Sequence, residues 1–94
     1  MKYRKLPVEI DAFPVWRICQ AYRLRGDLLE ALPDWVIDAM GEGVIEIKVD
    51  SIVVKTLEGH HETDGEDMLI RGVKGELYGC KSDIFQATYA EVPE

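Results

Sequence analysis

Apolar and polar residues alternate through residues 6–12, which is the pattern of a half-buried β-strand. The even-numbered positions are apolar and would share one face, whereas Pro7, Glu9 and Asp11 would share the other. Because proline has no N–H to donate to a neighbouring strand, we expect this strand to lie at a sheet edge or to pair only from Val8 onward.

The same alternation returns in residues 44–57 and predicts a hairpin. Apolar and charged residues alternate up to Val49, and a second apolar run, residues 52–57, follows Asp50 and Ser51. We therefore expect Val49 to share the buried face of the first strand and Asp50-Ser51 to form a two-residue connection.

Turn signals divide the later part of the chain. Asp64 and Gly65 mark a turn within the charged stretch 61–67, which we interpret as a solvated hairpin tip. The two glycines of the stretch GVKG bracket a further turn, so residues 68–80 predict another hairpin.

Residues 15–25 predict a short helix. They contain neither glycine nor proline, and the apolar residues Ile18, Cys19 and Tyr22 recur at helical spacing. The arginines of this segment point to more than one side, so they form no basic stripe.

Residues 27–40 carry the strongest helix signals. Asp27 can cap a first turn, and Pro33 suits the first position of a second segment, so we expect a kink or two short helices that meet near Leu32. The glycines after Met40 supply the stop signal. The expected apolar face comprises Trp35, Val36, Ala39 and Met40, and the outward face comprises Asp34, Asp38 and Glu42.

A closing helix is predicted over residues 82–89. Ser82 would be the N-cap, and Asp83 lies in the first turn, where the helix dipole favours a negative charge. The residues expected on one side are Ile84, Phe85, Thr88 and Tyr89.

Together these elements predict one α+β domain over residues 1–94, with a mainly antiparallel sheet of four or five strands and two or three short helices. The region 27–40 would cover one face and residues 82–89 would close an edge. Ninety-four residues suit a single hydrophobic core. Contents of 47% hydrophobic and 31% charged residues are typical of soluble globular chains.

Composition also predicts a cytoplasmic protein. The longest apolar runs are a few residues, against the roughly 20 that a membrane span needs, and the N-terminus lacks the apolar region of a secretion signal. Cys19 and Cys80 are too few for a disulfide framework, and we interpret both as small buried side chains.

The charge is unevenly distributed along the chain. Up to Arg25 there are six basic and two acidic residues, a balance of +4, and from Gly26 onward there are five basic and sixteen acidic residues, a balance of −11. A chain with this net charge of −7 repels nucleic acid and anionic lipid, so we expect no direct binding to either. A basic protein surface would attract it.

Few residues suggest reaction chemistry. His60 and His61 lie among carboxylates, but adjacent residues of an extended segment point to opposite faces, so one histidine at most could join a weak metal site. Neither cysteine has the neighbouring motif of a nucleophile, and the stretch GVKG lacks the rest of a phosphate-binding loop. We therefore assign no catalytic residue, no metal and no cofactor.

The opening residues MKYRKLPVEIDAF and the closing stretch LIRGVKGELYGCKSDIFQATY resemble the PGDYG-like family of small bacteriophage and prophage proteins. The segment KTLEG at 55–59 and the segment 72–89 carry this resemblance. Gly65-Glu66-Asp67-Met68 replaces the Pro-Gly-Asp-Tyr turn of that family. The resemblance implies a phage accessory protein in the cytoplasm of a bacterial host and brings no known activity.

These observations lead to the hypothesis of a non-enzymatic binding protein that inhibits a host defence protein, such as a CRISPR effector, through an acidic surface. The partner would have a basic surface, and a homodimer is compatible with so small a core. The carboxylates assigned to this surface, expected on a single exposed side, are Asp34, Asp38, Glu58, Glu62, Asp64, Glu66 and Asp67.

Three alternatives remain. The first is a sponge for a small anionic nucleotide, bound by a patch of Arg71, Lys74, Tyr78 and Lys81. The second is a small hydrolase that would need a metal or a thiolate. The third is a purely structural or accessory role, in which the acidic surface only maintains solubility.

Overall fold

The computed structural model describes residues 1–3, 8–24 and 31–92, and in this part of the chain it contains six strands and three helices. One antiparallel sheet has the order β1 (Asp11–Pro14), β5 (Met68–Arg71), β6 (Leu77–Cys80), and the other has the order β2 (Ile45–Ile47), β3 (Ser51–Thr56), β4 (Gly59–Asp64). The helices are α1 (Val15–Leu24), α2 (Asp34–Gly41) and α3 (Ser82–Thr88). The predicted α+β class with antiparallel strands and short helices is confirmed.

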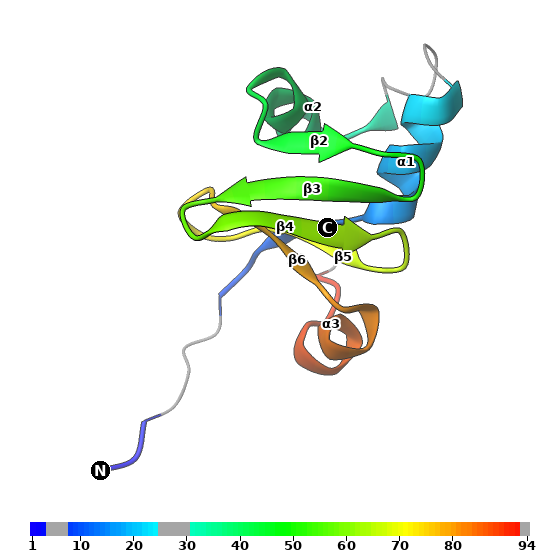
Figure 1. The fold of residues 1–94 in the computed structure, drawn as a ribbon. Helices are drawn as coiled ribbons and strands as arrows, with labels where there is room; N and C mark the ends of the chain where they lie inside the picture. Colours follow the sequence, from blue (N-terminus) through cyan, green and yellow to red (C-terminus); the bar gives the residue numbers. More distant parts are fainter. Residues whose placement is uncertain (4–7, 25–30, 93–94) are drawn as a thin grey trace.

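The helices flank the two sheets at different places (Figure 1). α1 continues directly from β1 and packs against the β2–β3–β4 sheet. α2 lies beside β2, whereas α3 follows β6 at the opposite side of the molecule. β6 contacts both β3 and β4, so the two sheets meet along this strand.

The core lies between the two sheets and α1. Ile18 from α1, Ile52 and Val54 from β3, and Leu69 from β5 are fully buried. Further buried members are Phe13, Val15, Cys19, Ala21, Leu32, Val36, Ala39 and Ile45. Ile70, although fully buried, is not part of this cluster, because successive side chains of β5 point to opposite faces of its sheet.

The turn between β5 and β6 fixes the register of these two strands. The N–H of Gly75 donates to the carbonyl of Gly72, and the N–H of Gly72 donates to the carbonyl of Glu76. Gly75 has φ 84°, a left-handed conformation that glycine adopts without strain. This is a type I turn followed by a glycine bulge, and it leads to the pairing of Arg71 with Leu77.

The two sheets are in close contact where Gly79 of β6 meets Thr63 of β4. A Cβ atom on Gly79 would lie 2.2 Å from Oγ1 and 2.7 Å from Cγ2 of Thr63. Thr63 is buried and β-branched, so its side chain has little freedom to move aside. Only glycine at position 79 therefore permits this contact.

The first predicted strand is displaced along the chain. β1 begins at Asp11, and Phe13 rather than Ala12 is buried, because the larger aromatic side chain faces the core. Val8 is half exposed and lies outside the strand, whereas Pro7 falls outside the described residues. β1 does lie at the edge of its sheet, as expected.

The predicted hairpin over residues 44–57 is present as β2 and β3, but its connection is residues 48–50 and Ser51 belongs to β3. Val49 is consequently exposed in the turn rather than on the inner face with the buried Ile45 and the half-buried Ile47.

The interpretation of residues 61–67 as a hairpin tip is wrong for its first half. Residues 59–64 form β4, which pairs with β3 along its whole length, and the tip lies instead at Leu57 and Glu58. This strand raises the number of strands to six, against the four or five predicted, and divides them between two sheets. The Asp64-Gly65 turn and the hairpin over residues 68–80 are confirmed.

The predicted helices agree with the structure except in detail. α2 has the expected apolar face, and it ends in a Schellman motif in which the N–H of Gly43 donates to Met40 and the N–H of Val44 donates to Ala39. Tyr22 of α1 is half exposed, and Ala21 is buried instead. The N-cap of α3 is Lys81 rather than Ser82, and no side chain caps this helix. The expected cap at Asp27 lies outside the described residues.

Substituting Gly79 tests the contact between the sheets. We expect Gly79→Ala to lower the free energy of unfolding by about 1–3 kcal/mol, as overpacking of a well-packed site does. Gly41→Ala is the matched control, because a Cβ at Gly41 meets no atom within 4 Å. We expect this control to change stability by no more than about 1 kcal/mol, and in the stabilising direction. Urea unfolding measures both.

A double substitution shows whether the loss comes from Thr63. If the new methyl group collides with Thr63, Gly79→Ala and Thr63→Ala combined cost less than the sum of the two single changes. Strict additivity would contradict the described contact.

Candidate functional site

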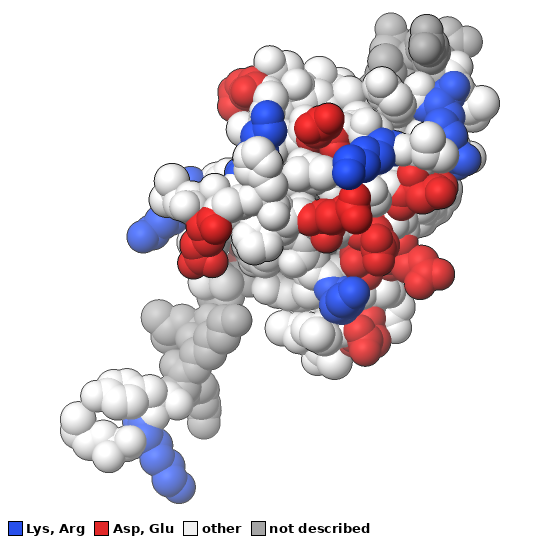
Figure 2. All heavy atoms as spheres, viewed as in Figure 1, with Lys and Arg blue, Asp and Glu red and all other residues white. Residues whose placement is uncertain are grey.

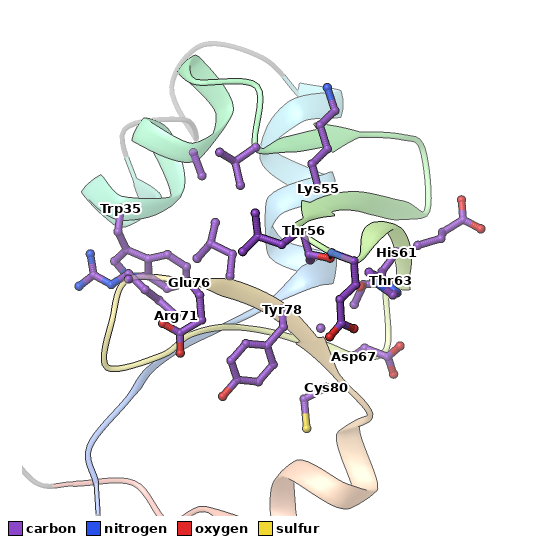
Figure 3. Close-up of a pocket in the computed structure, with 18 of the residues that line it drawn as sticks. Trp35, Lys55, Thr56, His61, Thr63, Asp67, Arg71, Glu76, Tyr78 and Cys80 are labelled. Carbon is purple, nitrogen blue, oxygen red and sulfur yellow. The ribbon is translucent and has the colours of Figure 1, made fainter.

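A groove of about 1070 Å³ opens where the two sheets diverge (Figure 3). One wall is β6 with its flanking residues 75–81, every one of which lines the groove. The facing wall is the β3–β4 hairpin, through residues 55–58 and 61–63. α2 closes one end with Trp35, Asp38 and Ala39, together with Glu42 just after the helix.

The groove exists because the core does not extend along the whole length of the sheets. On β4, His61 lies opposite the fully buried Val54 and so belongs to the core-facing side of its sheet, yet it is exposed. Thr56 and Leu77 are half-buried on the two walls. The inner surfaces of both sheets thus continue past the core into solvent.

Negative charge predominates along the groove. Six carboxylates and three cationic side chains line it, which gives a formal charge of −3 with His61 neutral. The carboxylates are Asp38, Glu42, Glu58, Glu62, Asp67 and Glu76, and the cations are Lys55, Arg71 and Lys81.

The charge of Arg71 is largely offset. Its Nε donates to Oδ2 of Asp11 at 3.0 Å, which ties β5 to β1 at a cross-strand pair. The guanidinium also lies over the ring of Trp35, 5.4 Å from the centroid. These two contacts hold Arg71 at the α2 end of the groove.

Glu62 is the one groove carboxylate with an ion pair in the described part of the chain. Nζ of Lys48 donates to Oε2 of Glu62 at 3.0 Å, and the Ser51 hydroxyl donates to the same oxygen at 3.2 Å. The bond from Lys48 is the main reason that the pKa of Glu62 is lowered.

Two ionisable groups of β6 stay protonated at neutral pH. Burial, with a further contribution from a hydrogen bond to Tyr89, raises the pKa of Tyr78 to about 12. Burial and the carboxylates of Asp67 and Asp83 raise the pKa of the Cys80 thiol. Cys19, which is buried and whose thiol lies 3.5 Å from the carbonyl of Ser51, also has a raised pKa, chiefly through burial. Both cysteines are free, and Cys19 is buried as predicted, whereas Cys80 is only half-buried.

The seven carboxylates assigned to one acidic surface lie at separate places. Asp38, Glu58, Glu62 and Asp67 line the groove, whereas Asp34 does not. Asp64 and Glu66 line a second cavity of about 650 Å³, together with Trp16, Arg23 and Asp50. Figure 2 shows acidic side chains gathered at the β4–β5 connection and others near α2 and the β3–β4 turn.

Asp67 differs from the other six because it is buried. Its carboxylate accepts a hydrogen bond from the N–H of Asp64 at 3.3 Å, and its own carbonyl accepts one from the N–H of Val15. Asp67 therefore holds the connection between the two sheets, a role that the sequence did not reveal.

The predicted ligand patch is also divided. Arg71, Tyr78 and Lys81 line the groove, but Lys74 lies in the β5–β6 turn and does not. The carboxylates around these residues and the ion pair at Arg71 make the groove unfavourable for an anionic ligand.

The adjacent histidines lie on β4 and point to opposite faces, as predicted, and only His61 lines the groove. Within residues 1–3, 8–24 and 31–92, no group of three or more His, Cys, Asp and Glu side chains is placed to hold a metal ion.

Sequence reasoning missed several groove residues. Trp35 packs against the core, as predicted, but it also forms part of the groove. Glu42 and Glu76 were not assigned to any site, although Glu42 belonged to the predicted outward face of its helix. No signal in the sequence identified Glu76.

Comparisons of the chain with protein-family models, with curated proteins and with solved structures return no match. None of the helices in the described residues is both long and apolar enough to cross a membrane.

The pKa of Tyr78 predicts how stability changes in alkali. Between pH 10, the ordinary pKa of tyrosine, and about 12, the folded protein keeps a proton that the unfolded chain releases. The free energy of unfolding should therefore fall as the pH rises through this window. Tyr78→Phe should show a smaller decrease over the same window, measured by urea unfolding at several pH values.

Tyr22→Phe serves as the control, because Tyr22 is half exposed on α1. This variant should follow the wild-type pH dependence. A Tyr78→Phe protein with an unchanged dependence would show that another group is responsible.

Proposed function

We propose that this protein is a non-enzymatic binding protein of phage or prophage origin that inhibits a host protein, such as a component of antiviral defence. It engages a basic surface of that partner through the carboxylates that surround the groove. The resemblance of residues 55–59 and 72–89 to small phage proteins supports the origin, and the groove supports the mode of binding.

The observation that carries the proposal is the set of unpaired carboxylates at the mouth of the groove. Asp38, Glu42 and Glu58 are exposed, and within the described residues none of them forms an ion pair. Carboxylates without a partner in the same chain can bind cations of another protein without first breaking an internal contact. Such complementary charges accelerate association and select the partner.

The protonation states of the most reactive side chains, two cysteines and Tyr78, support a binding role rather than a catalytic one. A cysteine nucleophile acts as a thiolate, but burial raises the pKa of both thiols. Tyr78, with a pKa of about 12, cannot act as a base at neutral pH.

Neutralising the groove carboxylates tests the proposal. The variant Asp38→Asn/Glu42→Gln/Glu58→Gln removes three negative charges from residues whose side chains make no hydrogen bond within the described part of the chain. A host protein captured from bacterial lysate by the wild type should be lost with this variant. The same protein should elute when salt is raised from about 0.1 M to about 0.5 M, because screening weakens exposed ionic contacts.

The matched control is Glu9→Gln/Glu46→Gln/Glu91→Gln, which removes the same charge from exposed residues that line neither cavity. It should retain the partner, and the purified partner should bind it with wild-type affinity. If both variants lose the partner equally, binding depends on net charge alone and not on the groove. If no salt-sensitive partner is captured at all, the proposed function is refuted.

A further inference from the structure

We infer that the free edge of β6 binds an extended segment of the partner protein as an added strand, and that lysine or arginine side chains of this segment meet the groove carboxylates. This inference rests on the proposed function and specifies where and in what form the basic partner binds.

The hydrogen-bond pattern identifies which backbone groups of β6 are free. The N–H of Gly72 donates to the carbonyl of Glu76 next to the turn, and along an antiparallel ladder hydrogen-bonded residue pairs alternate with pairs that are not hydrogen-bonded. In the register of β5 and β6, the pairs Ile70–Tyr78 and Met68–Cys80 lie two and four residues from Gly72–Glu76 and are therefore hydrogen-bonded as well. Tyr78 and Cys80 thus direct their N–H and C=O groups to β5. Leu77 and Gly79 direct theirs to the opposite side.

That opposite side carries no strand. β6 stands at the end of its sheet, and within the described residues neither Leu77 nor Gly79 makes a backbone hydrogen bond to another strand there. Gly79 is exposed even though its Cα faces Thr63, so its backbone is accessible from the groove. The accessible stretch, residues 75–81, comprises β6 and its flanking residues, and the four residues of β6 span roughly 13 Å of extended chain.

The other edges near the groove are less suited to strand addition. On β4, the N–H of Asp64 already donates to the carboxylate of Asp67. β1 contains Pro14, which has no N–H to donate. β6 has neither obstruction, and Gly79 places no side chain of its own over the strand.

The charge of the groove determines which kind of segment can bind as the added strand. The added strand would lie beside β6 in the plane of the β1–β5–β6 sheet, along the groove whose formal charge is −3. Arg71 is engaged by Asp11, so the cations that remain on the walls are Lys55 and Lys81, against Asp38, Glu42, Glu58 and Glu76. An acidic segment would be repelled, whereas a basic segment gains ionic contacts in addition to backbone hydrogen bonds.

A synthetic peptide tests strand addition directly. The probe is an acetylated and amidated peptide of alternating lysine and valine, about seven residues long to match the accessible stretch. Titrated into the ¹⁵N-labelled protein, it should slow hydrogen exchange of the Leu77 and Gly79 amides about tenfold or more, since these N–H groups become hydrogen-bonded. The amides of Tyr78 and Cys80, already bonded to β5, are the internal reference.

A second peptide separates strand pairing from charge. The same sequence N-methylated at every internal amide has equal charge but no backbone N–H to donate, and it should bind at least about tenfold more weakly. The variant Asp38→Asn/Glu42→Gln/Glu58→Gln should weaken the binding of the unmethylated peptide. A peptide of alternating glutamate and valine should not bind.

The outcomes distinguish this inference from the proposed function. Equal affinity for both lysine peptides, without protection of Leu77 and Gly79, overturns strand addition and leaves the acidic groove as a binding surface. Absence of binding by either lysine peptide overturns strand addition, while the lysate experiment still decides the proposed function. In the absence of peptide, the Leu77 and Gly79 amides could instead become more protected from exchange as the protein concentration rises. That result would show that a second copy of this chain pairs with the edge, and it would overturn the inference that a segment of a partner protein binds there.

Discussion

The architecture depends on one close contact, the approach of Gly79 on β6 to Thr63 on β4. The two residues belong to different sheets, and the absence of a side chain at position 79 lets the strand backbone lie directly on the threonine. Both residues also line the groove that opens between the sheets. The connection through Asp67, which bonds to both Asp64 and Val15, carries the chain from one sheet to the other.

Elements stabilised by the burial of apolar side chains were predictable from sequence. The strand β4, which is stabilised by backbone hydrogen bonds to a neighbouring strand, was not. The helix α2 and the hairpin of β2 and β3 have apolar residues at the spacing of their secondary structure, so their pattern identified them. The strand β4 has the sequence GHHETD, with only Thr63 buried, and it exists because its backbone completes hydrogen bonds with β3. Residues 8–10 show the opposite case, since their alternation suggested a strand where the structure has none.

The candidate site was less accessible to sequence analysis than the fold. The excess of acidic residues after Gly26 was evident, but their positions depend on which segments the fold brings together. Asp38 and Glu58 are twenty residues apart and line one groove, whereas Glu62 and Asp64 are near neighbours and line different cavities. The role of Asp67 could not be anticipated, because a buried carboxylate that bonds to a backbone N–H has the same sequence signature as an exposed one.

The placement of the two tryptophans gives the molecule a pair of independent optical reporters. Trp35 is half-buried beside Arg71 at the groove, and Trp16, 52% exposed, borders the second cavity. The two indoles will differ in their wavelength of maximum emission and in how strongly water-soluble quenchers reduce their fluorescence. Replacing either ring with phenylalanine leaves a single tryptophan, whose emission can be excited selectively, so occupancy of each cavity can be followed in unlabelled protein.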